Sequence, residues 1–198
     1  MKNRRRSREA ALQALYYMDA RNNLSLEALA LFQRCFALSE KVQPFFETLT
    51  RGVMRNRRQI DQLIERFSSN WKISRMACVD RNVMRIALYE ILYLDDIPEK
   101  VSINEAIDIG KKFGTEDSGA FINGILDSAH IAIKNKEIQV EGESDAAIPE
   151  RIPAADAIGP SESERGPGAS FSRVRGRPGV VRRRGTASPP ATDETQKK

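Results

Sequence analysis

The chain has 198 residues, a net charge of +5, two cysteines and one histidine. That length suits one domain or two small ones, and no apolar run reaches the eighteen or more residues that a membrane-spanning helix needs. The basic start has no apolar segment behind it, which excludes a secretory signal.

Little in the composition supports catalysis. The single histidine is not joined by a Cys-x-x-Cys pair, a phosphate-binding loop or a dinucleotide-binding turn. We therefore expect no enzyme, no metal and no cofactor. Cys35 and Cys78 each lie in a helical apolar context, which predicts two separate, reduced, buried thiols and a cytoplasmic protein by default.

The start of the chain is strongly basic. Five cations and no acid precede position 9: Lys2, Arg4, Arg5, Arg6 and Arg8. Such an arm usually contacts phosphates, because each neutralised phosphate releases a counterion, although a solvated arm without a partner is the alternative. The apolar spacing that follows predicts a helix over residues 7–20, with Ser7 as its cap and Arg8 in its first turn.

Helical spacing continues through the middle of the chain. It predicts a helix from about residue 25, a long helix over 42–67, a short one over 74–79 and another over 80–94. Asp80 is the expected N-cap of the last of these. Gly52 lies inside the long helix, where glycine costs stability, so we expect it to mark close packing against a neighbour. The polar break at 68–70 predicts two sub-bundles packed together.

Two more helices complete the predicted fold. Ser102 and Glu105 have the spacing of a capping box for a helix that reaches Phe113. Gly114 then predicts a left-handed turn, and a last helix is expected over 118–134. The fold class is therefore all-α, with about seven helices.

The turn between these helices carries candidate ligand groups. Lys111 supplies a cation beside Gly114, and Phe113 and Phe121 supply two rings on which unpaired bases can stack. The spacing alone favours a core role for either ring, so the core reading stays open.

The end of the chain differs in composition. The last 61 residues, 138–198, contain seven glycines and seven prolines with a single aromatic residue. Such a segment buries too little apolar surface to offset the entropy of ordering it. We predict a helical domain over 1–136 and a disordered tail over 137–198, which either adds nonspecific RNA affinity or is inert.

Three runs resemble a known family: 79–90 (VDRNVMRIALYE), 97–106 (IPEKVSINEA) and 111–127 (KKFGTEDSGAFINGILD). In this order, after an arginine-rich start, they closely resemble the NusB family of bacterial transcription antitermination factors over about residues 4–130. The resemblance implies the same all-α architecture. It says nothing about the tail.

The resemblance also implies binding surfaces. NusB-like proteins bind the boxA element of ribosomal-RNA leader transcripts, and the matching residues here are Arg5, Arg6, Arg8, Lys111, Phe113, Asp117, Ser118 and Phe121, beside Arg4 of the basic start. Asp117 is unusual there, because a carboxylate repels phosphate; it would accept a hydrogen bond from a base edge or cap the helix. Tyr16 and Asp80 match the surface that meets NusE, a small-subunit ribosomal protein.

The expected function is antitermination. With NusE, the chain would hold boxA-like RNA and join the elongating RNA polymerase complex in ribosomal-RNA operons. A helical adaptor that binds only protein is one alternative, and a homodimer in the absence of RNA stays open. A relation to the accessory domain of ribosomal-RNA cytosine methyltransferases is disfavoured, since the chain has no room for their catalytic domain.

Overall fold

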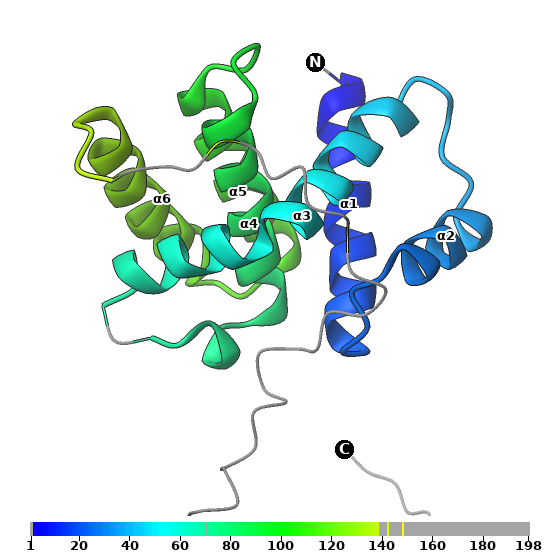
Figure 1. Ribbon diagram of the computed structural model, residues 1–198, viewed down its shortest axis with the longest axis horizontal. Helices are drawn as coiled ribbons and strands as arrows, with labels where there is room; N and C mark the ends of the chain where they lie inside the picture. The colour runs from blue at the N-terminus through cyan, green and yellow to red at the C-terminus, as the bar shows by residue number, and fades with distance from the viewer. Residues whose placement is uncertain (1, 70, 139–141, 143–147, 149–198) are drawn as a thin grey trace, which may run out of the picture. The chain divides into compact units, whose positions relative to one another are not determined.

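A computed structural model describes residues 2–69, 71–138, 142 and 148. In chain order its elements are α1 (Lys2–Ala20), α2 (Leu26–Cys35), α3 (Gln43–Phe67), the 3-10 helix η1 (Ile73–Arg75), α4 (Cys78–Tyr93), α5 (Glu99–Phe113) and α6 (Ser118–Lys134) (Figure 1). No strand occurs in this described part, which confirms the predicted all-α fold of about seven helices. None of its helices has the length and apolarity needed to cross a membrane. The predicted tail, 137–198, lies almost wholly outside the described residues.

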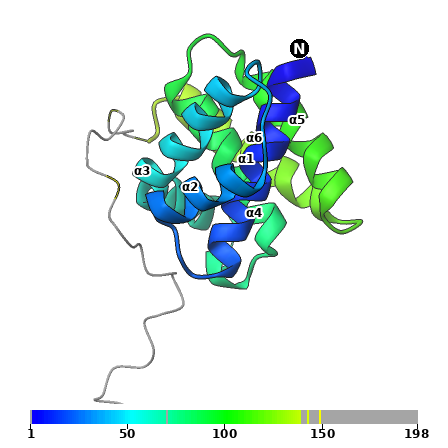
Figure 2. The same cartoon turned by 90° about the vertical axis from the view of Figure 1, so that its right-hand side faces the viewer.

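The helices form two groups that share one core. In the first, α1 packs against α2 and α3; in the second, α5 packs against α4 and α6. The groups meet where α4 contacts both α1 and α3, as the two views show (Figures 1 and 2). Four helices contribute completely buried side chains there: Leu15 from α1, Phe46 from α3, Met84 and Leu88 from α4, and Ile122 from α6. Burial of such side chains contributes about 1.5–3 kcal/mol each, which makes this shared core the main stabilising element.

Gly52 lies where α3 crosses α4. A Cβ atom at this position would lie 1.9 Å from Cζ and 2.2 Å from Cε2 of Tyr89. Only glycine lets the two helices approach with the Tyr89 ring between them. The prediction of close packing at Gly52 is confirmed.

A buried cluster of charges joins α1, α3 and α4. Arg85 is 1% exposed and donates to Asp61 Oδ1 at 2.7 Å and to Asp19 Oδ2 at 3.1 Å. Arg81 also donates to Asp19, at 2.7 Å. Burial raises the pKa of the Asp19 carboxyl, but the hydrogen bond from Arg81 and the charges of both arginines outweigh it and hold the pKa at about 2. This cluster is a structural one, because every charge in it is paired.

Three predicted helix starts are wrong. α1 begins at Lys2, and Ser7 is a buried interior residue that donates to the Val42 carbonyl at 2.7 Å. α4 begins at Cys78, so Asp80 is the third residue of its first turn rather than its cap. α5 begins at Glu99, and Ser102 donates from inside the helix to Glu90 Oε2 at 2.6 Å. In each case a tertiary contact takes the hydroxyl or carboxylate that local pattern assigns to a cap.

Two further predictions are corrected. Gly114 has φ −97° and ψ −154°, which is not a left-handed conformation. Cys35 is exposed rather than buried, and Cys78 is half-buried. Burial and the neighbouring Asp19 carboxylate raise the pKa of the Cys78 thiol to about 11, so it stays protonated at neutral pH.

Candidate nucleic-acid interface

The first turns of α1 present three exposed or half-exposed arginines. Arg4 Nη2 lies 2.7 Å from Asp96 Oδ2, in the segment between α4 and α5. Arg5 Nη1 lies 3.1 Å from Asp108 Oδ2 and 3.5 Å from Glu105 Oε1, both on α5. Arg6 is exposed and has no ion pair within the described part of the chain. Because these arginines lie at the surface, they are accessible to phosphate.

The carboxylates of α5 keep the Arg5 side chain in place. The hydrogen bond to Asp108 raises the pKa of the Arg5 guanidinium, burial opposes this rise, and the charges of Glu105, Asp108 and Glu9 add to it. Both partners are well exposed, so the pair is of the weak surface kind. An RNA phosphate can therefore compete with Asp108 for this cation.

Arg8 differs from its neighbours, because it is buried. Its Nε and Nη2 donate to the two carboxylate oxygens of Glu90 at 2.7 and 2.8 Å, and Glu90 is itself 1% exposed. Its Nη1 has a second, longer contact with Glu105 Oε2 at 3.4 Å. Breaking the Glu90 pair would leave the buried guanidinium with this contact alone, which is strongly destabilising. Arg8 is therefore not presented to RNA, contrary to the prediction, and instead ties α1 to α4. A signal was available: Arg8 continues the fully buried stripe of Ala11 and Leu15 at helical spacing.

The turn between α5 and α6 is built by close backbone contact. A Cβ atom on Gly114 would lie 2.4 Å from Ser118 Oγ and 2.8 Å from the Gly110 carbonyl, so glycine is needed here for space. Ser118 is buried and its hydroxyl accepts a hydrogen bond from the Thr115 backbone N–H at 2.8 Å. Ser118 thus shapes the turn and is not itself exposed to a ligand. Asp117, one residue earlier, is exposed and makes no side-chain cap.

One ion pair brings the two predicted halves of the site together. Lys112 Nζ bonds Glu9 Oε1 of α1 at 2.8 Å and lies 4.8 Å from the centre of the Phe113 ring. The Phe113 side of α5 therefore lies against the same face of α1 that carries Arg5. Phe113 is 37% exposed, which leaves part of its ring open for stacking.

The second ring has a neighbour that sequence reasoning missed. Phe121 is half-buried, and its ring centre lies 6.1 Å from that of Trp71, tilted by 57°. Trp71 is 55% exposed although it is the only tryptophan of the chain. A large aromatic side chain in a polar interhelical break was the available signal. Lys111 is exposed, and its aliphatic stem packs over Gly119 at the start of α6.

The two residues predicted to meet a protein partner have different surroundings. Asp80 is buried; burial raises its carboxyl pKa, which a hydrogen bond with Ser118 opposes, and its Oδ1 has no partner among the described residues. Tyr16 is 47% exposed. It lines an apolar groove of about 450 Å³ with Phe36 and Phe113. Of the two, only Tyr16 is presented to a partner.

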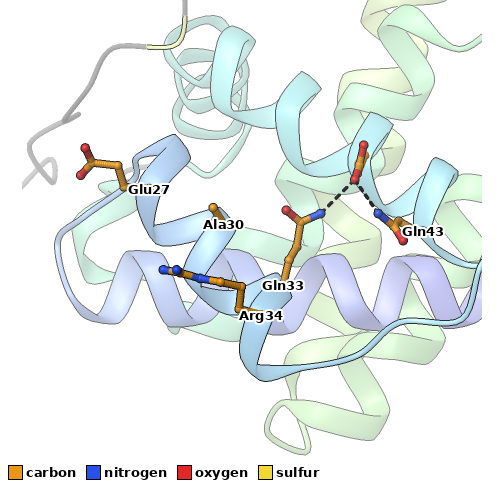
Figure 3. A pocket seen from close by; sticks show the side chains of 6 residues that line it. Glu27, Ala30, Gln33, Arg34 and Gln43 are labelled. Carbon is orange, nitrogen blue, oxygen red and sulfur yellow. Dashed lines mark hydrogen bonds between the residues drawn. The ribbon is translucent and has the colours of Figure 1, made fainter.

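A separate polar hollow of about 560 Å³ lies between α2 and the start of α3 (Figure 3). Gln33 and Gln43 each donate to Oε1 of Glu47 at 3.0 Å across it. These groups satisfy one another, and none of the predicted site residues lines the hollow. Within the described ranges, no cluster of three side chains is suited to hold a metal ion.

Comparison with known proteins decides the family. The NusB family model matches residues 5–130. The transcription antitermination protein NusB of Desulfatibacillum aliphaticivorans is 55% identical over 137 residues, covering 69% of this chain and 96% of that protein. The chain belongs to the NusB family. NusB of Myxococcus xanthus is 47% identical over 134 residues, covering 66% of this chain and 96% of its own.

Solved structures of NusB proteins share the fold. T. maritima NusB superimposes with a TM-score of 0.59 at 38% identity, over 68% of this chain and 97% of that one. A chain from a crystal structure of antitermination factors NusB and NusE with double-stranded RNA gives a TM-score of 0.60 at 25% identity, over 67% and 98%. NusB proteins are transcription antitermination factors and not enzymes, which confirms that prediction for this member of the family.

Proposed function

We propose that this chain binds a boxA-like single-stranded RNA on a surface made by α1, the end of α5 and the start of α6. We name this the RNA surface, and its members are Arg4, Arg5, Arg6, Lys111, Phe113, Asp117 and Phe121. One observation supports it above all. The pair between Lys112 and Glu9, at 2.8 Å, aligns the arginine-bearing helix with the exposed Phe113 ring.

Each group has a role suited to flexible, negatively charged RNA. The arginines and Lys111 neutralise phosphates, while the Phe113 and Phe121 rings stack unpaired bases. Asp117 is exposed and accepts a hydrogen bond from a base amino group, which favours particular bases over others. Arg8 and Ser118 hold the surface in shape from beneath.

A protein partner occupies the neighbouring groove. The groove of Tyr16 and Phe113 is apolar and adjoins the RNA surface through Phe113, and a structural neighbour is a NusB protein in complex with NusE. We propose that a NusE-type ribosomal protein covers this groove with Tyr16 as an anchor. RNA and protein then bind with mutual avidity and carry the chain to the elongating polymerase of ribosomal-RNA operons in the bacterial cytoplasm.

Fluorescence anisotropy with a labelled boxA-like RNA tests this function. The logarithm of the affinity is expected to fall linearly with the logarithm of salt concentration, and the slope should drop by about 0.7 for each of Arg5→Ala and Arg6→Ala. Phe113→Ala should weaken binding by roughly 1–3 kcal/mol without changing the slope. Arg34→Ala replaces an exposed arginine of α2; it is the matched control and should change neither the affinity nor the slope.

The result that contradicts the proposal is RNA binding that is absent or insensitive to salt. Retained binding of NusE in that case would favour the alternative, a helical adaptor that contacts only protein. Sedimentation of the free chain tests the homodimer separately, since RNA should dissociate a dimer formed through the same surface.

A further inference from the structure

A second cationic face runs along α3. Its members are Arg51, Arg55, Arg58 and Arg66. At 100° per residue these four positions fall within an arc of about 80°, and at 1.5 Å per residue they extend over about 22 Å of helix. Arg55, Arg58 and Arg66 are exposed and Arg51 is half-exposed. We name this the α3 face.

The guanidinium groups of the α3 face are not paired with carboxylates. No ion pair to any of the four occurs within the part of the chain that the structure describes, whereas Arg57, on the buried side, pairs with Asp61 at 3.2 Å. The two flanking acids are engaged elsewhere. Glu47 accepts hydrogen bonds from Gln33 and Gln43, and Glu65 accepts the Ile73 backbone N–H at 3.1 Å.

The α3 face is distinct from the RNA surface. α3 packs closely against α1 and α4 and, to a smaller extent, against α6, whereas α5 packs mainly against α4 and α6. Figure 2 shows α3 on one side of α1 and α5 on the other. The arginines of the α3 face thus lie on a different helix from Arg5, Lys111 and Phe113.

We propose that the α3 face binds the phosphate backbone of the same RNA molecule, outside its boxA-like segment. This proposal rests on the proposed function, because it assumes that the RNA is already held on the RNA surface. Four uncompensated cations in one row match a polyanion and would lower the affinity for most other ligands. The guanidinium of Arg66 lies over the Phe67 ring, 5.7 Å from its centre, a cation–π contact that does not neutralise its charge.

A protein partner fits this face less well. Protein interfaces have a core of buried aromatic and apolar anchors surrounded by a polar rim. Gln62 lies between the arginines of the α3 face, and Thr48 precedes the first of them by about one turn; both are exposed and polar. Phosphate contacts need no apolar anchor, so RNA is the ligand that these residues favour.

Two RNAs and two triple variants test the inference. One RNA is a boxA-like oligonucleotide of about 12 nucleotides, and the other carries about 30 further single-stranded nucleotides, more than one binding site can hold. The test variant combines Arg51→Gln, Arg55→Gln and Arg58→Gln. The control variant removes the same charge from exposed positions elsewhere and combines Arg34→Gln, Lys41→Gln and Lys134→Gln. Glutamine keeps helix propensity, and circular dichroism checks the fold.

The expected result is confined to the long RNA. Wild type should bind it with a steeper salt dependence than the short RNA, and the test variant should lose about 2 units of that slope, three contacts at about 0.7 each. At 0.1 M salt this corresponds to roughly a ten- to hundred-fold weaker affinity for the long RNA. Affinity for the short RNA should match wild type, and the control variant should behave as wild type on both.

Three results would overturn the inference. The first is that the wild type binds both RNAs with the same salt dependence. The second is that the test and control variants lose the same affinity for the long RNA. The third is that the test variant binds both RNAs like wild type but no longer binds NusE. If the triple variant does not fold, the three single variants, each expected to lose about 0.7 of slope, decide the matter. Failure of wild type to bind even the short RNA would instead refute the proposed function.

Discussion

Asp108→Asn should strengthen RNA binding. In the free protein Asp108 Oδ2 lies 3.1 Å from Arg5 Nη1, so the carboxylate competes with phosphate for this guanidinium. Asparagine keeps the size and a hydrogen-bond acceptor but removes the charge. The substitution therefore tests whether an intramolecular carboxylate limits the affinity of the RNA surface.

The size of the effect follows from the exposure of the pair. The Arg5 and Asp108 side chains are 37% and 55% exposed, and exposed ion pairs contribute about 0.2–1 kcal/mol. Removing the competitor should raise the affinity for boxA-like RNA by about 1.4- to 5-fold. The salt slope should stay nearly constant, because Arg5 neutralises one phosphate in either protein.

A double-mutant cycle measured by anisotropy separates this effect from a general change in charge. In the Arg5→Ala background, Asp108→Asn should gain much less affinity than in wild type. Asp127→Asn removes an exposed carboxylate of α6 and serves as the matched control. Equal gains from Asp108→Asn with and without Arg5, or from Asp127→Asn, would refute the idea of competition for one guanidinium.

Three further predictions concern stability, each read from chemical denaturation. Gly52→Ala should lower the free energy of unfolding by about 1–3 kcal/mol, because the added Cβ atom clashes with Tyr89. Gly124→Ala is the control: nothing lies within 4 Å of its added Cβ atom, and it should raise the free energy of unfolding by about 0.5–1 kcal/mol. Equal effects of the two substitutions would contradict this prediction. Glu90→Ala should cost about 3–5 kcal/mol, because buried Arg8 then keeps only its longer contact with Glu105, at 3.4 Å. Folding lowers the pKa of Asp19 from 3.8 to about 2, so its ionised form contributes about 2 kcal/mol to the free energy of unfolding. This contribution is present above about pH 4 and is lost as the pH falls toward 2. Asp19→Asn should therefore make the free energy of unfolding depend less on pH in this range.

Apolar spacing predicted the long elements well. The prediction of 42–67 corresponds to α3 (Gln43–Phe67), and 118–134 matches α6 in full. Both helices bury one continuous apolar stripe, and this burial is what periodicity detects. Helix starts were predicted less well, because Ser7 and Ser102 can hydrogen-bond either to a local backbone N–H or to a distant acceptor. Only the fold decides between the two.

The candidate site, too, could be predicted only in part from the sequence. Residue types and the family resemblance were enough to select the α1 arginines and the α5–α6 turn, but not to tell Arg5 from Arg8. Arg8 follows Arg5 by three residues, so their side chains point in directions about 60° apart around the helix axis. This difference is enough to direct Arg8 toward Glu90 and leave Arg5 at the surface. The exposure of Phe113 likewise depends on how α5 lies against α1, which no local pattern encodes.

The arginines of this chain perform different tasks because their partners differ. Arg85, buried between two carboxylates, stabilises the junction of three helices and is unavailable to any ligand. Arg5 is exposed yet paired, so its affinity for phosphate is reduced by the carboxylate it must leave. Arg58 is exposed and unpaired within the described part of the chain. The net charge of +5 therefore says little about RNA affinity, which depends on the cations that no carboxylate has already neutralised.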